Sequence, residues 1–508
     1  MRPPVGPDAT SPLAPVLFGD DAVALFRRLS HDLNPLHADG AYARRTPFGA
    51  PVVHGMLGVL AALRPVTRSG PVRLRALRAK FLGPLFTSTS YDLGFDASTK
   101  GDARIQLGAG GSAKVELRLR HELSTPHAPP MAMPQGWRPQ PAPLDPSVAE
   151  LGGLRHEGSY AIDPGAAAEL DGALGIGLEN LPASQLQALA WISYSCGMLV
   201  PGRQSLIGDI ELAFADGDAG PGPLGFQVEV GQHSTVGMMR LKARLQAGGR
   251  PVADVTINAL RRPDPVAFSL EALLEHASRG EALRGQVALV TGGSRGLGAY
   301  LVGALCLQGA DVWLNYRTGA EEAEQLRAAL VGTGGAVRVV QGDVTDAAAC
   351  QRLAAEVVAA GGIDVLIANA SPPIRAATLA EQGADALERF VAGSLRACLL
   401  PTAALLPSLR KSRGCVVAVS SRYAATAPAR FAHYVAAKGA IEGLVTSLAR
   451  EEKSVRFALA RPPKLLTDQT NINFDFEQRL HPARAAARIV EHLLQPASAG
   501  EVSMLDRF

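Results

Sequence analysis

The chain has 508 residues, which is too long for a single hydrophobic core and predicts two to four domains. Hydrophobic residues make up 47% and charged residues 19%, and the formal net charge is +3, a balance typical of a soluble globular protein that argues against a nucleic-acid binder. No apolar run approaches the ~20 residues that a membrane span needs. The start, Met1-Arg2-Pro3-Pro4, lacks the apolar core of a secretory signal.

The cysteines are few and scattered. They are odd in number and form no CxxC pair, a pattern that indicates reduced thiols and predicts a cytoplasmic location. The sequence also contains no HExxH motif and no paired Cys/His spacing, so we expect no metal. The five are Cys196, Cys306, Cys350, Cys398 and Cys415.

The N-terminal part combines a polar motif with one apolar helix and several strands. The motif is Asp32-Leu33-Asn34-Pro35-Leu36-His37, and an apolar stretch at 52–63 predicts a buried helix with Gly55 near its start. Alternating apolar and polar residues then predict half-buried antiparallel strands. These strands are expected at 72–86, 88–95 and 113–121. A proline-rich segment, 126–146, reads as an extended linker.

The middle of the chain repeats that order without the motif. Residues 181–200 predict a helix, and four alternating strands are expected at 205–214, 225–232, 238–246 and 251–260. A helix followed by antiparallel strands, twice, indicates two copies of one unit. Each sheet curled around its helix would leave one face open, and pairing the copies would close it. A second break follows at Arg261-Arg262-Pro263-Asp264-Pro265.

The last part of the chain has a different order of predicted elements. A short apolar strand at 287–290 is followed by a glycine-rich turn and a helix to about residue 309. Further short apolar strands at 312–315, 337–340, 365–368 and 416–420 are separated by helical segments. This βαβ alternation predicts a doubly wound parallel sheet.

The N-terminal motif suits the addition or removal of water beside a carbonyl. Removing water from a 3-hydroxyacyl thioester needs a base for the C2 proton, an acid for the departing hydroxyl and a donor for the developing oxyanion. Asp32 and His37 could supply the first two, and a backbone N–H at the helix start near Gly55 the third. Taken singly, Asp32 and His37 could equally be a capping and a surface residue.

The motif, together with His54-Gly55-Met56-Leu57 and the later Phe81-Leu82-Gly83-Pro84-Leu85-Phe86, resembles the MaoC-like (R)-specific enoyl hydratases. The resemblance implies a hot-dog fold, Asp32 and His37 as the catalytic pair, Gly55 as the oxyanion contact and Asn34 as support for the pair. The middle block is similar to the inactive half of a double hot-dog, which completes the acyl tunnel. His54 alone is more often structural than catalytic.

The C-terminal block resembles the short-chain dehydrogenase/reductase family, through a glycine-rich turn and, downstream, Ser421 with Tyr434-x-x-x-Lys438. Tyr434 would donate a proton to a carbonyl oxygen, Ser421 would hold that oxygen, and the ammonium of Lys438 would lower the pKa of the phenol. Two positions depart from the family pattern: Ser394 stands where the family has a catalytic Asn, and Pro463 where it has Gly. The turn is Thr291-Gly292-Gly293-Ser294-Arg295-Gly296-Leu297-Gly298.

Charge near the second strand of this block bears on the cofactor. An acid there would bond the ribose 2′-OH of NAD, but the strand ends Asn315-Tyr316-Arg317. Arg317 and Arg295 could reach a 2′-phosphate, so NADP(H) is expected, although either arginine alone could be a surface charge. The resemblance implies that Asp343-Val344 contacts adenine. Asn369 lies in Ala368-Asn369-Ala370, which stands where the family has Asn-Asn-Ala-Gly.

These patterns predict an α+β double hot-dog followed by an α/β Rossmann-type doubly wound parallel sheet. The expected divisions are 1–125 (hot-dog with the motif), 126–150 (linker), 151–265 (motif-free hot-dog), 266–282 (linker) and 283–508 (reductase domain). The predicted function is NADPH-dependent reduction of a 3-oxoacyl thioester and dehydration to the 2-enoyl form. Alternatives are hydration followed by oxidation, a dehydratase with an inactive reductase-like domain, and a polyketide accessory enzyme. The acyl group would be carried by CoA or an acyl carrier protein, and a homodimer through the reductase domains is expected.

Overall fold

The computed structural model describes residues 13–98, 101–131, 133–217, 219–220, 222–234, 237–472 and 479–508. The chain divides into two compact units. The first comprises Met1–Arg44, Ala50–Asp264 and Ile472–Phe474, and the second Arg45–Gly49, Pro265–Asn471 and Asp475–Phe508.

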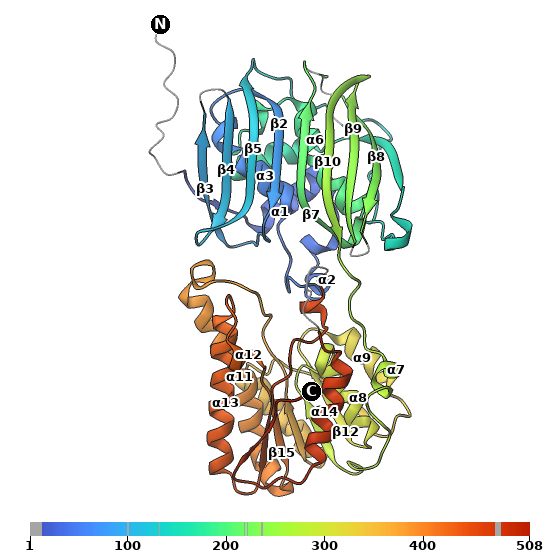
Figure 1. Cartoon of the computed structure of the whole chain (residues 1–508), viewed down its shortest axis with the longest axis vertical. Helices are drawn as coiled ribbons and strands as arrows, with labels where there is room; N and C mark the ends of the chain where they lie inside the picture. Colours follow the sequence, from blue (N-terminus) through green and yellow to red (C-terminus); the bar gives the residue numbers. More distant parts are fainter. Residues whose placement is uncertain are drawn as a thin grey trace. The chain divides into compact units, whose positions relative to one another are not determined.

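In the described part of the first unit, ten strands form one antiparallel sheet in the order β1-β3-β4-β5-β2-β7-β10-β9-β8-β6 (Figure 1). Each half contributes five strands, and pairing of β2 with β7, which sets Leu77 opposite Leu212, joins the halves. The strands are β1 (Val16–Leu17), β2 (Val72–Phe81), β3 (Ser90–Ala97), β4 (Asp102–Ala109), β5 (Ser112–Leu123), β6 (Arg155–Tyr160), β7 (Ser205–Phe214), β8 (Leu224–His233), β9 (Met238–Ala247) and β10 (Arg250–Arg261).

Two apolar helices form the centre of this unit. Every residue of α6 (Ala183–Tyr194) is buried, as is every residue of α3 (Gly55–Ala62) after the first. Such helices have no polar face to offer water, so the sheet encloses them. Around them lie α1 (Asp20–Ser30), η1 (Pro35–His37), α2 (Gly40–Ala43), α4 (Arg64–Thr67), η2 (Val148–Glu150), α5 (Pro164–Leu174), η3 (Leu178–Asn180), the π-helical turn η4 (Ser195–Leu199) and η5 (Gly202–Gln204).

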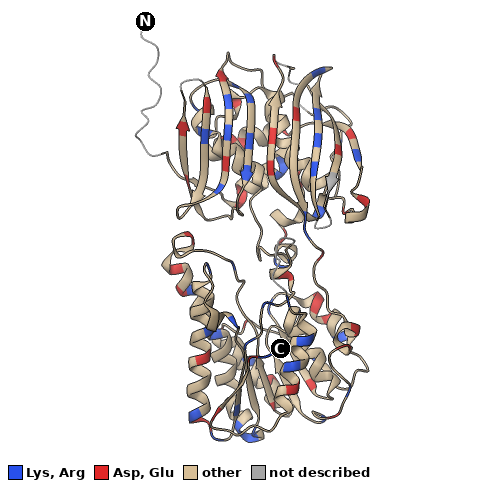
Figure 2. Ribbon diagram, viewed as in Figure 1, with Lys and Arg blue, Asp and Glu red and all other residues tan. Residues whose placement is uncertain are grey.

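Strict alternation along the strands separates core from surface. In β9, exposed and buried residues alternate throughout, and Figure 2 shows charged residues along the strands of the sheet. The predicted order of a helix and then antiparallel strands, twice, is present. Strand β4 alternates just as clearly but was not predicted, nor were β1, β6, α1 and α5. The strand expected at 72–86 ends at Phe81, before Gly83-Pro84.

The proline-rich segment contains no helix or strand among its described residues up to Ser147, as predicted, but it is not a free tether. The Trp137 ring lies 6.2 Å from the Tyr160 ring and 5.1 Å from the His31 ring, measured between centroids. The indole N–H of Trp137 donates to the Ser159 carbonyl at 2.9 Å, and the Leu144 N–H donates to the Met198 carbonyl at 2.9 Å. The segment therefore forms part of the first unit's packed surface.

Among the residues described for the second unit, seven strands form a parallel sheet in the order β13-β12-β11-β14-β15-β16-β17, which confirms the predicted doubly wound parallel sheet. The strands are β11 (Val287–Val290), β12 (Asp311–Tyr316), β13 (Val337–Gln341), β14 (Val365–Ala368), β15 (Cys415–Val419), β16 (Arg456–Ala460) and β17 (Val502–Leu505). The helices are α7 (Leu270–Leu274), α8 (Gly296–Leu307), α9 (Ala320–Ala329), α10 (Ala347–Ala359), α11 (Leu379–Ser412), α12 (Tyr423–Thr426), α13 (Ala432–Glu451), η6 (Asp468–Thr470) and α14 (Pro482–Leu494).

Two helices of this unit differ from expectation. Residues 266–282, expected as a linker, contain α7, whose Leu273 is fully buried and which packs on α8. Helix α11 is long and apolar enough, by length and composition only, to cross a membrane. It is interrupted by non-helical backbone at Gly383, and it packs against α13 and β14. These contacts make it a covering helix of the parallel sheet.

Candidate active sites

Asp32 is fixed by partners on both of its carboxylate oxygens. It follows the left-handed residue His31 (φ 55°), which ends α1, and its side chain is 2% exposed. Oδ1 accepts the backbone N–H of Asn34 at 3.1 Å, and Oδ2 accepts the Ser193 hydroxyl at 2.7 Å. The orientation of the carboxylate is therefore set before any substrate binds.

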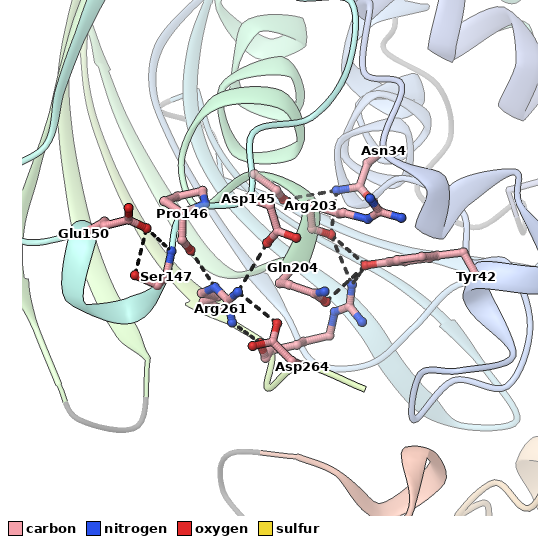
Figure 3. Close-up of polar contacts among 12 residues, drawn as sticks. Asn34, Tyr42, Asp145, Pro146, Ser147, Glu150, Arg203, Gln204, Arg261 and Asp264 are labelled. Carbon is pink, nitrogen blue, oxygen red and sulfur yellow. Dashed lines mark hydrogen bonds and ion pairs between the residues drawn. The ribbon is translucent and has the colours of Figure 1, made fainter. Parts of the chain in front are cut away.

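Asn34 connects the motif to the other half of the first unit. Its side-chain oxygen accepts the Leu36 N–H at 3.0 Å and so begins the short helix that carries His37. Its Nδ2 donates to three carbonyls of the motif-free half: those of Gly197 (3.2 Å), Gly202 (3.2 Å) and Arg203 (3.3 Å). Asn34 therefore supports the geometry of the pair, and its bond to Arg203 is drawn in Figure 3.

His37 and His54 form a stacked pair beside Asp32. The Nδ1 of His37 lies 2.8 Å from the Val52 carbonyl, which makes it the donor nitrogen and leaves Nε2 for chemistry. The two imidazole centroids are 3.6 Å apart with planes inclined at 24°. His54 is fully buried, and its ring also contacts Phe26 at 4.9 Å.

Burial and their mutual charge interaction shift the pKa values of Asp32 and His37. Burial raises the pKa of Asp32, against the opposing effects of His37, the Ser193 hydroxyl and the Asn34 N–H. Burial lowers the pKa of His37, against the opposing charge of Asp32. The two shifts move the two pKa values toward each other, so a proton can pass between carboxylate and imidazole at modest cost.

The motif-free half, 151–265, contributes directly to this site. Ser193 lies on α6, and Gly197 lies in the π-helical turn that follows it. A Cβ built on Gly197 would overlap the Asp32 carboxylate, so this position requires glycine. Both residues were missed by sequence reasoning. The small residues that interrupt an otherwise apolar helix at 193–197 were the available signal.

Gly55 is the first residue of α3, where the backbone N–H has no intrahelical partner. A Cβ at this position would lie 2.8 Å from the Phe81 ring, so only glycine lets that ring cover the helix start. The expected oxyanion donor is therefore at the start of a buried helix, as the sequence predicts.

A polar network holds the Arg203 carbonyl, one of the three that accept from Asn34 (Figure 3). The Tyr42 hydroxyl donates to the Arg203 carbonyl at 3.0 Å and accepts Nη2 of Arg262 at 2.9 Å. Arg261 donates to the Pro146 carbonyl at 2.7 Å and pairs with Asp264 at 2.9 Å. The end of β10, the proline-rich segment and α2 are thereby joined beside the site.

Asp32, His37 and His54 each offer one atom to a cluster whose members lie within 4.8 Å of one another, although no metal was expected. One observation disfavours a tetrahedral metal. Nitrogen ligands of a tetrahedral zinc at 2.0–2.1 Å would be about 3.4 Å apart, and their ring planes must converge on the ion. The rings of His37 and His54 are instead nearly parallel and stacked.

In the second unit, the glycine-rich turn joins β11 to α8. Gly292 has φ +64°, and a Cβ on Gly298 would overlap the Gly292 carbonyl, so the helix packs closely on the turn. Asn369 donates from Nδ2 to the carbonyls of Thr291 (3.1 Å) and Gly292 (3.2 Å). The Thr291 hydroxyl accepts the Asn369 N–H at 3.0 Å. Thr291 and Asn369 therefore hold the shape of the turn.

The remaining residues of the turn have separate environments. Ser294 is half-buried, Gly296 has φ +54° and begins α8, and Leu297 is buried in the core. Arg295, expected at a 2′-phosphate, forms an ion pair at 3.5 Å with Asp468.

Ser421, Tyr434 and Lys438 are brought together at the carboxyl end of β15. Tyr434 and Lys438 lie one turn apart on α13, and the Lys438 ammonium is 5.6 Å from the Tyr434 ring centroid. Nζ of Lys438 donates to the Val419 carbonyl at 2.8 Å, and burial lowers the pKa of this lysine to about 8. The expected lowering of the Tyr434 pKa by Lys438 is not seen. Burial raises that pKa, and the opposing effect comes from a hydrogen bond with Ser421.

The comparisons with known proteins match both domains. A family model described as short chain dehydrogenase matches residues 286–477, and one described as MaoC like domain matches residues 6–108. An uncharacterized oxidoreductase of Methylorubrum extorquens is 31% identical over 192 residues, which cover 37% of this chain and 77% of that protein. The chain belongs to the short-chain dehydrogenase family. It carries a MaoC-like domain ahead of the dehydrogenase domain.

Other relatives match the dehydrogenase domain. The fatty acyl-CoA reductase of Acinetobacter baylyi is 30% identical over 237 residues, covering 44% of this chain and 75% of that protein. The L-fucose dehydrogenase of Rattus norvegicus is 33% identical over 171 residues, 33% of this chain, and the match spans about three fifths (61%) of that protein. A solved short chain dehydrogenase from Burkholderia cenocepacia J2315 in complex with NADP is 28% identical, covers 44% of this chain and 98% of that chain, and gives a TM-score of 0.41.

The structure shows what surrounds the two positions of the dehydrogenase domain that depart from the family pattern, Ser394 and Pro463. Ser394 on α11 is 2% exposed, and its hydroxyl has no hydrogen-bond partner among the described residues. Just before Pro463, Arg461 forms a two-bond ion pair (2.6 and 2.7 Å) with Glu442, which also accepts the Ser420 hydroxyl at 2.6 Å. The unusual loop is thus tied to α13 four residues beyond Lys438.

In the dehydrogenase domain, the residue expected to contact adenine, Asp343, pairs with the residue expected to contact the 2′-phosphate, Arg317. Arg317 lies 3.4 Å from Asp343, whose other oxygen accepts the N–H and hydroxyl of Thr345 at 2.8 and 2.7 Å. The Arg317 side chain is 59% exposed, so it can turn toward a ligand at little cost. The Val344 side chain is buried in the core, which leaves only its backbone for a nucleotide.

Proposed function

We propose that this chain is a bifunctional enzyme that processes the β-carbon of acyl thioesters. The dehydrogenase domain reduces a 3-oxoacyl thioester to the 3-hydroxyacyl form, and the MaoC-like domain, a double hot-dog, removes water to give the 2-enoyl form. The observation that carries the proposal is the pairing of Asp32 with His37 in a buried site whose members all have orienting partners. The reduced product of one site is the substrate of the other.

Elimination at the first site uses three groups. One member of the Asp32–His37 pair removes the C2 proton, and the other protonates the hydroxyl as the C3–O bond breaks. The thioester oxygen gains negative charge, and the Gly55 N–H at the start of α3 stabilises it. The proton that remains on the base returns to the other member of the pair, which restores the site.

Reduction at the second site uses Tyr434, Ser421 and Lys438. Tyr434 protonates the carbonyl oxygen, and Ser421, already hydrogen-bonded to Tyr434, holds that oxygen. NADP(H) fits the residues present, because the turn at Gly292 allows close approach and β12 ends without an acid. Bound NADPH would supply the hydride, with Arg317 near its 2′-phosphate.

A thioester substrate is supported by one relative, since the Acinetobacter protein is named for reduction of a fatty acyl-CoA. CoA and a carrier protein both present the acyl group as a thioester on a phosphopantetheine arm. All five cysteines are free and buried, in keeping with a cytoplasmic enzyme. Dimerisation through the dehydrogenase domains is part of the same proposal.

The deciding experiment supplies a 3-oxoacyl thioester and NADPH and identifies the product by mass. A gain of two hydrogens followed by loss of water supports the proposal. A product that stays at the 3-hydroxy stage contradicts the dehydratase assignment. Faster turnover of a 3-hydroxyacyl thioester with NAD than reduction with NADPH would instead support the oxidative direction.

A second function, a dehydratase with an inactive dehydrogenase-like domain, is favoured by two residues. Ser394 replaces the family's catalytic Asn, and Pro463 replaces a glycine beside the expected nicotinamide site. Titration of the intact chain with NADPH distinguishes the two functions. Binding without reduction of any 3-oxoacyl thioester would support the second.

A further inference from the structure

His54 is a buried side chain whose ring nitrogens have only weak contacts with Asp32, through its backbone and at 3.9 Å from its carboxylate. It is 0% exposed, and neither ring nitrogen has a hydrogen-bond partner among the described residues. Buried polar atoms are rarely left unsatisfied, and those that are often bind a water or serve in catalysis. Its position, stacked on His37 and with Nε2 3.9 Å from Oδ2 of Asp32, places it in the MaoC-like site.

The spacing of the three side chains suits a water molecule. Three atoms separated by no more than 4.8 Å leave a position about 2.8 Å from each, which is the usual length of a hydrogen bond. A water with two to four polar partners is stable in a buried site, and this site offers three.

The charge state of His54 also suits water. Burial, followed by the charge of His37, keeps the pKa of His54 well below its usual value, against a smaller opposing effect from the Asp32 backbone. A neutral imidazole offers one donor and one acceptor nitrogen, and the weak contact with the Asp32 backbone leaves the other nitrogen for a water. His54 can therefore hold a water without competing with Asp32 and His37 for the transferred proton.

We propose that Asp32, His37 and His54 form a three-point cradle for the water molecule that is added to, or removed from, the acyl chain. This inference rests on the proposed dehydratase function and deepens it by assigning His54 as a water-binding residue. In hydration, the water oxygen bonds to C3, one water proton passes to one member of the Asp32–His37 pair, and the other member delivers a proton to C2. His54 orients the water and exchanges no net proton.

Two substitutions separate hydrogen bonding from packing. His54→Phe keeps a ring to stack on His37 but removes both nitrogens, and His54→Gln keeps a donor and an acceptor. We expect His54→Phe to lower kcat for hydration of a 2-enoyl thioester about 100-fold with little change in KM, and His54→Gln to recover at least a tenth of the wild-type rate. His156→Phe, a half-buried histidine on β6, is the matched control. Thermal unfolding of the same variants reports on the folding of the MaoC-like domain.

A high-resolution crystal structure of the intact chain supplies a readout that does not depend on turnover. The expected result is a water within hydrogen-bond distance of Asp32, His37 and His54 that is lost in His54→Phe. An unoccupied position, a metal, or a His54→Gln variant as slow as His54→Phe overturns the inference. If the water is present but wild-type protein hydrates no enoyl thioester, the proposed function fails while the water site stands.

Discussion

The two sites of this chain differ in how the protein holds the side chains that are expected to act in catalysis. In the MaoC-like domain, both oxygens of Asp32 and the Nδ1 of His37 have partners, and Asn34 is held by three carbonyls. In the dehydrogenase domain, Ser394 is buried without a partner. The catalytic pair of the first site is preorganised by the protein alone, although His54 beside it is not, whereas the second site leaves Ser394 without a described partner and pairs Arg317 with Asp343, a contact that a nucleotide would replace. Preorganised groups are expected to lose more activity when a supporting residue is removed.

Of the substitutions that test this difference between the sites, Asp32→Asn should have the largest effect on activity. The amide cannot accept or return a proton, so hydration of a 2-enoyl thioester should fall about 10³-fold or more. Consumption of NADPH with a 3-oxoacyl thioester should stay within twofold of wild type. Loss of both activities would show that the sites are not independent.

Tyr434→Phe should have the reciprocal effect. Removing the phenol hydroxyl eliminates the proton donor, so reduction should fall about 10³-fold while hydration continues. The measurement is NADPH absorbance with a 3-oxoacyl thioester. A variant that still reduces at the wild-type rate would remove Tyr434 from the mechanism and favour a different donor.

Ser193→Ala tests whether the motif-free half orients the catalytic carboxylate. A hydrogen bond to a charged group is worth ~1.5–3 kcal/mol, so kcat for hydration should fall about 10- to 100-fold. Because the Ser193 hydroxyl lowers the pKa of Asp32, its loss should raise that pKa and move the acidic limb of the pH profile to higher pH.

Ser195→Ala is the matched control for Ser193→Ala. Its hydroxyl is buried in the next half-turn but has no partner among the described residues. We expect a rate within twofold of wild type and an unchanged pH profile. An effect as large as that of Ser193→Ala would show that any hydroxyl lost here disturbs packing, and that the bond to Asp32 is not special.

A smaller effect than at the catalytic residues is expected at Arg317, which is exposed and already paired with Asp343. Arg317→Ala should raise KM for NADPH about tenfold and leave KM for NADH within twofold, since only NADPH carries the 2′-phosphate. Initial rates at varied cofactor concentration measure both constants. Equal changes for the two cofactors would place the phosphate contact elsewhere.

Local sequence determined the elements with strong periodicity and the residues that sit within one motif. The strand at 205–214, the strand at 287–290 and the one-turn spacing of Tyr434 and Lys438 follow from short-range pattern, because apolar alternation and helical pitch are local properties. The Asn-Pro turn likewise sets His37 close to Asp32 within six residues.

Only the tertiary structure decided which distant residues complete the sites. Ser193 and Gly197 reach Asp32 across more than 160 positions of sequence, through the packing of α6 against α1, and the small residues around them in the sequence do not say which carboxylate they contact. Burial likewise made His54 a neutral ring and raised the pKa of Tyr434, against the lowering that its spacing to Lys438 predicted. Desolvation depends on everything that surrounds a group in space, and a linear pattern does not contain that information.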